Sequence, residues 1–350
     1  MACWLPVVNC STMRLGGHLL LVAICAQLWL IDTTSADGGP SLGASMKKYT
    51  KLFDSENTLH MMNVLEGGLS KGRAELEPDV LKSLDRYGEF LSETIRGPRS
   101  RESAVAIEVA WNVVTVLSLA SYYVLYHVRI QNDPGEAITA CHDLLWLAHS
   151  YREQAADGLW YISASGVEAH ALQQLATIVA ESRPKLEELR LDWIRKVGRT
   201  TEERPDLLAK LLVDGFDPGQ ISNGDVREFL VMAAHDLERV KSLSDLPTFA
   251  KQLTASARTP EQRKVVPVIR PILKRWIRSR VVHKATDRGL RGVIKLTLLR
   301  LPKEEVLQTI IDPFSGQPAR SHPKGFYYVG VNGKDEGGES GDDLLYLTEP

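Results

Sequence analysis

The sequence contains little cysteine, and what it has is concentrated at one end. Its 350 residues include 4 cysteines. Cys3, Cys10 and Cys25 lie at or near the N-terminal apolar segment, which leaves Cys141 alone in the rest of the chain. A lone cysteine forms no internal disulfide, and no Cys and His cluster with zinc-site spacing occurs. The remainder of the chain must therefore be held together by its apolar core.

Recognisable catalytic motifs are also missing. The sequence has no glycine-rich phosphate loop, and SASG at 163–166 lacks the leading glycine of a nucleophile elbow, so we interpret it as a polar loop before a helix. His142, His149 and Glu153 share a helix face but are spaced too widely for one metal ion, and we interpret them as solvent-facing. The pattern predicts a protein without catalysis and with no evident small-molecule substrate. An enzyme with a dispersed active site is the alternative.

The N-terminus carries a targeting signal. Leu15 to Ile31 contains no charged residue and is followed by Thr34, Ser35 and Ala36, small residues that suit a signal peptidase. We expect residues 1–36 to act as an export signal cleaved after Ala36. An uncleaved membrane anchor is the main alternative, because the run is just long enough to span a bilayer. Residues 37–45 read as a flexible leader.

A second apolar stretch runs from Val109 to Val128. Asn112 lies within it, and Arg96, Arg99 and Arg101 precede it. If the N-terminal region is exported, these arginines lie outside, against the tendency for positive charge to stay inside. We therefore expect a buried central helix, with a second transmembrane span as the alternative.

Residues 46–311 show a helical period. The connections are short, so successive helices should be antiparallel neighbours. The sequence thus predicts a mainly α fold, an irregular helical bundle or array of antiparallel helical hairpins with a small C-terminal β-hairpin unit at 312–350. Helices are expected at 78–95, from 133 until Gly158, at 166–181, 184–197, 204–214, 223–243 and 247–257, and from Thr259 through Pro267 and Pro271.

The last of these helices is strongly basic. Between Arg263 and Lys303 the chain carries 13 Lys or Arg residues and a single acid, Asp287, although the net charge of the whole chain is -2. In the segment 268–281 the apolar residues share one face, whereas Lys274, Arg275 and Arg278 lie largely opposite. This pattern is typical of a bundle helix with a basic outer face, or of a helix that meets an anionic membrane surface or an envelope protein. No nucleic acid partner is expected for an exported chain. The segment's apolar positions are Val268, Ile269, Ile272, Leu273, Trp276, Ile277 and Val281.

The period changes after Ile311. Asp312-Pro313 is turn chemistry, and Phe326 to Val331 is rich in aromatic and β-branched residues. Asn332-Gly333 is a strong hairpin signal, and Leu344 to Leu347 would return as a short strand.

The tail also carries a resemblance. DPFSGQP, FYYVGVNGKDEGG and GDD resemble the C-terminal signature of a group of uncharacterised bacterial exported or membrane-anchored helical proteins. More distantly, they are similar to the calcium-binding C-terminal region of type II secretion major pseudopilins. Tyr328 stands where the pseudopilins have Ser, and Asn332 where they have Asp. The prepilin signature is absent. The residues that carry the resemblance are Asp312, Pro313, Phe314, Gly316, Gly330, Asn332, Gly333, Gly337, Gly338 and Asp342.

The acidic residues of the tail allow two interpretations. Calcium takes six to eight oxygen ligands, and a glycine-rich loop lets backbone carbonyls turn inward. Asn332, Asp335, Asp342 and Asp343 would supply the side-chain oxygens of a structural Ca2+ site. The other interpretation is a solvated acidic turn that faces the basic helix.

Taken together, these patterns predict an exported, envelope-associated helical scaffold or interaction protein, periplasmic or membrane-anchored. The resemblance of the tail implies an alternative, an accessory component of a type II secretion or pseudopilin-like system.

Overall fold

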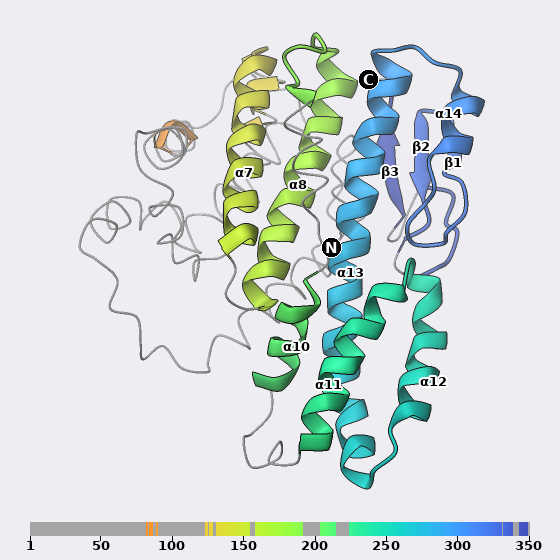
Figure 1. Ribbon diagram of the computed structural model, residues 1–350. Coiled ribbons are helices and arrows are strands. Elements are labelled where there is room, and N and C mark those ends of the chain that lie inside the picture. Colours follow the sequence, from red (N-terminus) through yellow and green to blue (C-terminus); the bar gives the residue numbers. More distant parts are fainter. Residues whose placement is uncertain are drawn as a thin grey trace.

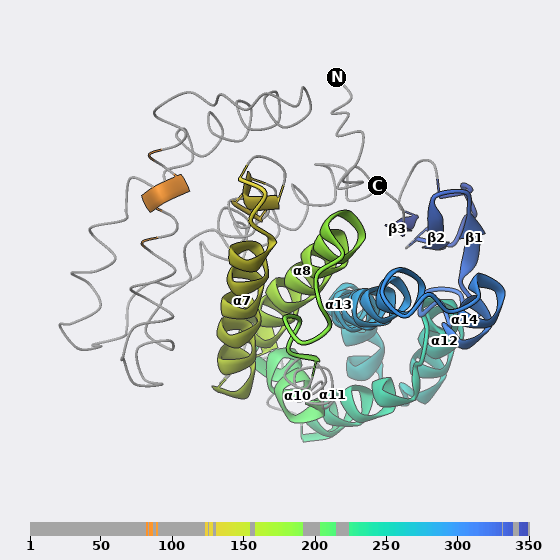
Figure 2. The same cartoon turned by 90° about the horizontal axis from the view of Figure 1, so that it is seen from above.

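Three long helices stand side by side in the computed structural model, and a small sheet covers the third (Figures 1 and 2). They are α7 (Pro134–Gln154), α8 (Gly158–Ser182) and α13 (Pro260–Thr297), with α8 packed against both of the others. The predicted mainly α architecture with a small C-terminal β unit is therefore confirmed. The structure describes residues 82, 84–86, 89, 123–124, 126–128, 131–154, 158–191, 204–214, 224–330, 332–338 and 343–348.

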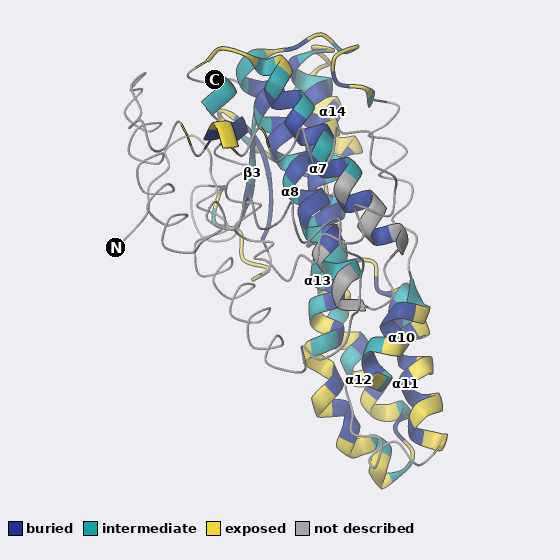
Figure 3. Ribbon diagram, turned by 90° about the vertical axis from the view of Figure 1, so that its left-hand side faces the viewer, coloured by how far each residue is buried: buried dark blue, intermediate teal, exposed yellow. Residues whose placement is uncertain are grey.

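Shorter helices lie around the N-terminal end of α13. α11 and α12 pack against it, and the chain turns directly from α12 into α13 (Figure 1). Figure 3 shows that this end carries more exposed residues than the region around α8. The remaining elements are α10 (Pro205–Asp214), α11 (Gly224–Asp236), η4 (Leu237–Arg239), η5 (Leu243–Asp245), α12 (Leu246–Ser256) and α14 (Lys303–Thr309).

α13 organises the fold. Its start is a complete capping box, in which Thr259 accepts from the amide of Gln262 at 3.2 Å and the Gln262 side chain accepts from the amide of Thr259. The helix continues through Pro267 and Pro271, whose rings lie on the exposed side, where water can satisfy the carbonyls that lose a backbone donor.

The buried side of α13 confirms the interpretation as a bundle helix. Ile269, Ile277 and Val281 are fully buried, and they join one hydrophobic core with residues of α7 and α8. Val268 is an exception, because its side chain is 53% exposed. Its assignment to the apolar face was wrong, since it lies on the solvent side of the helix among the exposed residues Pro267 and Pro271.

The C-terminal tail forms a three-stranded antiparallel sheet in the order β1-β2-β3. Its strands are β1 (Arg320–His322), β2 (Gly325–Tyr328) and β3 (Leu344–Leu347). Phe326 and Tyr346 stack with ring centroids 5.2 Å apart, and the Tyr346 hydroxyl donates to the Ala285 carbonyl of α13 at 3.1 Å. The sheet therefore shares the core of the helices instead of forming a separate unit.

Two details of the predicted hairpin are corrected. The tight turn lies between β1 and β2, where His322 pairs with Gly325, and β1 itself was not predicted. Asn332-Gly333 turns the chain locally, with Gly333 at φ 71° and its amide bonded to the Gly330 carbonyl, but it is only one part of the connection between the paired strands β2 and β3 and not a two-residue hairpin turn. β2 and β3 are instead connected by the longer segment 329–343, and β3 matches the predicted strand.

Several predicted helix boundaries also differ. α8 begins at Gly158, so the sequence SASG at 163–166 lies inside a helix and not in a loop. Residues 185–190 form successive tight turns, with Arg190 at φ 45°, where a helix was expected to begin. α11 ends at Asp236 and gives way to η4, which shortens the helix predicted to reach residue 243.

Glycines make the contact between α13 and the sheet possible. A Cβ atom added to Gly289 would lie 2.1 Å from the Tyr346 ring, whereas one added to Gly166 of α8 would meet nothing within 4 Å. We expect Gly289→Ala to destabilise the protein by about 1–3 kcal/mol through overpacking. Gly166→Ala should stabilise it by about 0.5–1 kcal/mol, because alanine favours a helix. Urea unfolding of both variants checks this, and a stabilising Gly289→Ala would contradict the docking of the sheet.

Two predicted membrane segments fall largely outside the described residues. Residues 1–36 and the leader at 37–45 are not described, and of the stretch 109–128 only residues 123–124 and 126–128 are. Tyr123 and Val124, at its end, are buried in the core. Among the helices that the structure describes, none combines the length and the apolar character that crossing a bilayer requires.

Candidate functional site

Asp343, one of the predicted calcium ligands, is fully buried and organises the loop before β3. Its Oδ1 accepts from the Gly330 amide at 3.1 Å, and its Oδ2 accepts from the amides of Glu336 and Gly338, both at 3.0 Å. Gly337 and Gly338 have φ of 75°, which allows the chain to curl its amides around the carboxylate. The double glycine is thus explained by a backbone that wraps an anion of its own chain.

Two other predicted ligands, Asn332 and Asp335, are exposed and make different contacts. The Asp335 carboxylate accepts from the Tyr327 hydroxyl at 2.9 Å and pairs with Arg320 of β1. The Asn332 side chain accepts from the amide of Lys334 at 2.6 Å. Asp342 lies outside the described residues. The acidic loop therefore faces β1 and not the basic helix, and Asp343 is not solvated as the acidic-turn interpretation required.

A second buried carboxylate, Asp312, holds the start of the tail. Its oxygens accept from the Phe314 amide at 2.8 Å, the Ser315 hydroxyl at 2.6 Å and the Val329 amide at 3.1 Å. Burial raises the pKa of this carboxyl. The DPFSG motif and the loop 332–343 are thus both tied to the end of β2, each by a single aspartate.

The calcium site stays a prediction. In the part of the chain that the structure describes, no three His, Cys, Asp or Glu side chains gather closely enough to hold a metal ion. The Asp343 oxygens already meet three N–H donors, which perform the neutralising role that a cation would otherwise have.

Thermal unfolding in calcium and in chelator tests this arrangement. We expect equal melting temperatures, because the loop is organised by its own amides. An ion that binds only the folded state stabilises it by about 2.7 kcal/mol at 100 times its dissociation constant. A rise of that order with calcium, absent with magnesium, would contradict our expectation and establish the ion site.

A buried cluster of charged groups ties the three long helices together. Glu168 of α8 is fully buried, and its Oε2 accepts from Nη1 of Arg152 on α7, whose side chain is only 2% exposed. Nε2 of His283 on α13 lies 3.3 Å from the same oxygen. Oε1 of Glu168 has no hydrogen-bond partner within the described chain. Periodicity did not reveal this cluster, because its members come from three different helices.

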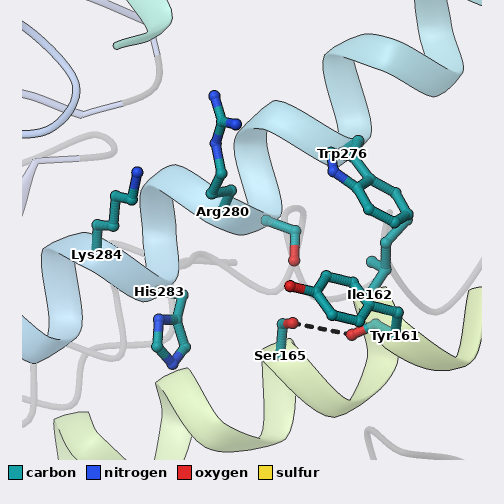
Figure 4. A pocket seen from close by; sticks show the side chains of 8 residues that line it. Tyr161, Ile162, Ser165, Trp276, Arg280, His283 and Lys284 are labelled. Atoms are coloured by element: carbon teal, nitrogen blue, oxygen red, sulfur yellow. Dashed lines mark hydrogen bonds between the residues drawn. The ribbon is translucent and has the colours of Figure 1, made fainter. Parts of the chain in front are cut away.

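A small cavity of about 20 Å³ lies beside the cluster, between α8 and α13 (Figure 4). His283 points from α13 toward α8, and the Ser165 hydroxyl donates to the Tyr161 carbonyl at 2.9 Å. Tyr161 stacks on Trp276 with ring centroids 5.1 Å apart. A cavity of this size holds about one water molecule. It is the feature closest to the dispersed active site considered above, yet its serine is engaged within its own helix.

His142 and His149 were predicted to face solvent, and this was wrong. Their exposed fractions are 6% and 5%. α7 packs against α8, and it shares its hydrophobic core with further residues, among them Tyr123 and Val124. Polar positions of α7 therefore also become buried. The Glu153 side chain lies outside the described set.

The burial of His142 predicts a loss of stability in acid. Burial and the nearby charge of Arg190 lower the pKa of His142 from 6.5 to about 4. In the unfolded chain this histidine takes up a proton below about pH 6.5, whereas the folded protein resists until about pH 4. We expect up to about 3 kcal/mol of unfolding free energy to be lost across this window. Urea unfolding between these pH values should show a flatter dependence for His142→Leu. The exposed His235→Gln should keep the wild-type slope, and equal slopes in all three proteins would contradict the assignment.

The cations of α13 fall into two groups. Those of its second half are used by the fold: Arg288 donates to the Ile311 carbonyl at 2.7 Å, Lys295 to Thr309 at 3.4 Å, and Arg291 pairs with Asp287 at 2.9 Å. Part of the basic block is therefore explained by the docking of the tail and its neighbouring loops.

The first half of α13 is mixed: Arg270 donates to the Thr254 hydroxyl of α12 at 2.6 Å, whereas three other cations are not used by the fold. Within the described chain, Lys264, Lys274 and Arg278 make no hydrogen bond or ion pair, and Lys264 and Lys274 are exposed. They recur at helical spacing on the side opposite Ile269 and Ile277. We call this side the basic strip, and its members are Lys264, Pro267, Val268, Pro271, Lys274, Arg275 and Arg278.

No protein-family model, curated protein or solved structure matches this chain. The resemblance of the tail to exported helical proteins and to pseudopilins accordingly stays a prediction.

Proposed function

We propose that the chain is an exported, envelope-associated helical protein that acts as a scaffold or interaction module without catalysis. The observation that carries this proposal is the basic strip. α13 uses the cations of its second half inside the fold and holds Lys264, Lys274 and Arg278 on a surface where they have no partner in the described chain. A group of cations on one surface attracts a partner of negative charge.

The rest of the fold holds the helix that carries this surface rigidly in place. The basic strip lies on a helix of 38 residues whose opposite side is fixed in the core by Ile269, Leu273 and Ile277. The far end of the same helix is held by the sheet, through Tyr346 and the glycines at its docking site. A surface on such a helix keeps its geometry when a partner binds, which lowers the entropic cost of association.

A pull-down from intact envelopes tests the proposal. We expect added protease to degrade the wild-type chain once the outer layers of the envelope are opened, because the chain lies outside the cytoplasmic membrane. We also expect it to retain envelope components that the variant Lys264→Glu/Lys274→Glu/Arg278→Glu releases. A chain that remains in the cytoplasm, or identical recovery with both proteins, would contradict the proposal. Recovery of pseudopilins would favour the secretion-accessory alternative.

A further inference from the structure

The basic strip has an apolar centre. Val268 is 53% exposed, and the exposed rings of Pro267 and Pro271 lie beside it on the same side of α13. Lys264 lies one turn before this centre, and Lys274 and Arg278 lie one and two turns after it. The surface thus combines apolar groups with cations on both sides along the helix.

We propose that the basic strip docks on an anionic phospholipid surface, with Lys264, Lys274 and Arg278 at the lipid phosphates and Val268 in the headgroup region. This inference rests on the proposed function, because it requires that export brings the chain to a membrane. It names the partner that the strip recognises. It also differs from the usual interfacial helix, whose apolar face enters the membrane, since the apolar face of α13 is already in the core.

Charge and shape both favour this partner. Cations near an anionic leaflet each contribute to binding, and Lys264, Lys274 and Arg278 have no competing partner in the described chain. The strip begins at the end of α13 that lies beside α11 and α12 (Figure 1), and Lys264, Val268 and Lys274 are exposed there. A nucleic acid backbone would also attract the cations, but its phosphates offer no apolar contact for Val268. The apolar centre therefore favours lipid.

Cosedimentation of the full chain, purified from the cells that express it, with vesicles tests the inference. One set of vesicles contains equal parts of phosphatidylglycerol and phosphatidylcholine, and the other contains phosphatidylcholine alone. We expect salt-sensitive binding to the anionic vesicles. Lys264→Gln/Lys274→Gln/Arg278→Gln should weaken it about 100-fold, since each cation near the surface contributes about one factor of five.

A matched control removes the same charge elsewhere. Arg300→Gln/Lys324→Gln/Lys334→Gln replaces three exposed cations located beyond the end of α13 and in the tail. Its affinity for anionic vesicles should equal that of the wild type. Five of these six side chains are exposed, and Arg278 is half-buried without a hydrogen bond or ion pair in the described chain. Both triple variants should therefore keep the wild-type helical content and melting temperature.

A second pair of variants tests the apolar centre. Val268→Gln should weaken vesicle binding about fivefold to tenfold, because it removes the contact of an aliphatic group with the headgroup region. Leu299→Gln, at a side chain that is 47% exposed beyond the other end of α13, should leave binding unchanged. Both substitutions leave the net charge of the protein as it is.

Three results would overturn the inference: no binding to anionic vesicles, equal weakening by both triple variants, or binding to random-sequence duplex DNA in place of vesicles. None of them depends on where the cell places the chain. Conversely, an exported chain that retains an envelope protein but not vesicles would leave the proposed function standing and remove only the lipid partner.

Discussion

Replacing Arg152 by methionine is expected to lower the free energy of unfolding by about 3–5 kcal/mol. The substitution leaves Glu168 fully buried without the guanidinium that neutralises it, and its Oε1 has no other partner in the described chain. After the substitution, the imidazole of His283 is the polar group left beside the carboxylate, with its Nε2 3.3 Å from Oε2. Urea unfolding of the purified protein measures the effect.

The controls separate an unpaired buried charge from simple loss of an ion pair. Arg204→Met removes a pair with Asp206 in which the side chains are 35% and 60% exposed, and it should cost less than about 1 kcal/mol. Arg152→Met/Glu168→Met should regain most of the stability lost by the single change, because two apolar side chains replace both charges. Equal stability of Arg152→Met and Arg204→Met would show that Glu168 does not link the helices.

Asp343→Ala is expected to destabilise the tail by about 4 kcal/mol, because two buried amides and one half-buried amide lose a charged acceptor. Each such hydrogen bond is worth roughly 1.5–3 kcal/mol, with incomplete additivity. The amides of Gly330, Glu336 and Gly338 would then lack the group around which the loop curls. Hydrogen exchange of these amides should rise, whereas exchange in α8 should change little.

Asp335→Ala is the matched comparison. This carboxylate lies on the same loop but is exposed, and its pair with Arg320 is accessible to solvent. We expect a cost of less than about 1 kcal/mol. If Asp335→Ala destabilised the protein as much as Asp343→Ala, the loop would depend on its acidic groups jointly, as a shared ion would require.

Local chemistry was sufficient to predict much of the helical fold. The capping box of Thr259 and Gln262, the turn proline at Pro134 and the apolar period of α13 depend on residues close in sequence, and all are seen. Asp133 caps α7 as expected, by accepting from the Glu136 amide at 3.0 Å.

The candidate sites depend on contacts across the chain and were harder to predict. Arg152 and Glu168 are 16 residues apart and meet only because α7 and α8 pack side by side. Asp343 stands in an acidic, glycine-rich run that reads as solvated, and its burial results from amides 5 to 13 residues earlier in the chain. A compositional signal could not separate it from Asp335, because the two residues have the same chemistry and opposite exposure.

The division of the basic block was likewise invisible in composition. Arg288 and Lys274 belong to the same charged run, yet one holds the Ile311 carbonyl and the other has no partner in the described chain. This difference underlies the proposed function, since it separates cations that stabilise the fold from cations that remain available to a partner.

Fractionation of expressing cells tests the central claim most directly. The chain and its variants are followed in the cytoplasmic, soluble extracytoplasmic and envelope fractions. We predict that the wild type and Arg300→Gln/Lys324→Gln/Lys334→Gln are recovered with the envelope, whereas Lys264→Gln/Lys274→Gln/Arg278→Gln shifts to the soluble extracytoplasmic fraction. Cytoplasmic recovery of the wild type, or an unchanged envelope location for the strip variant, would contradict the account.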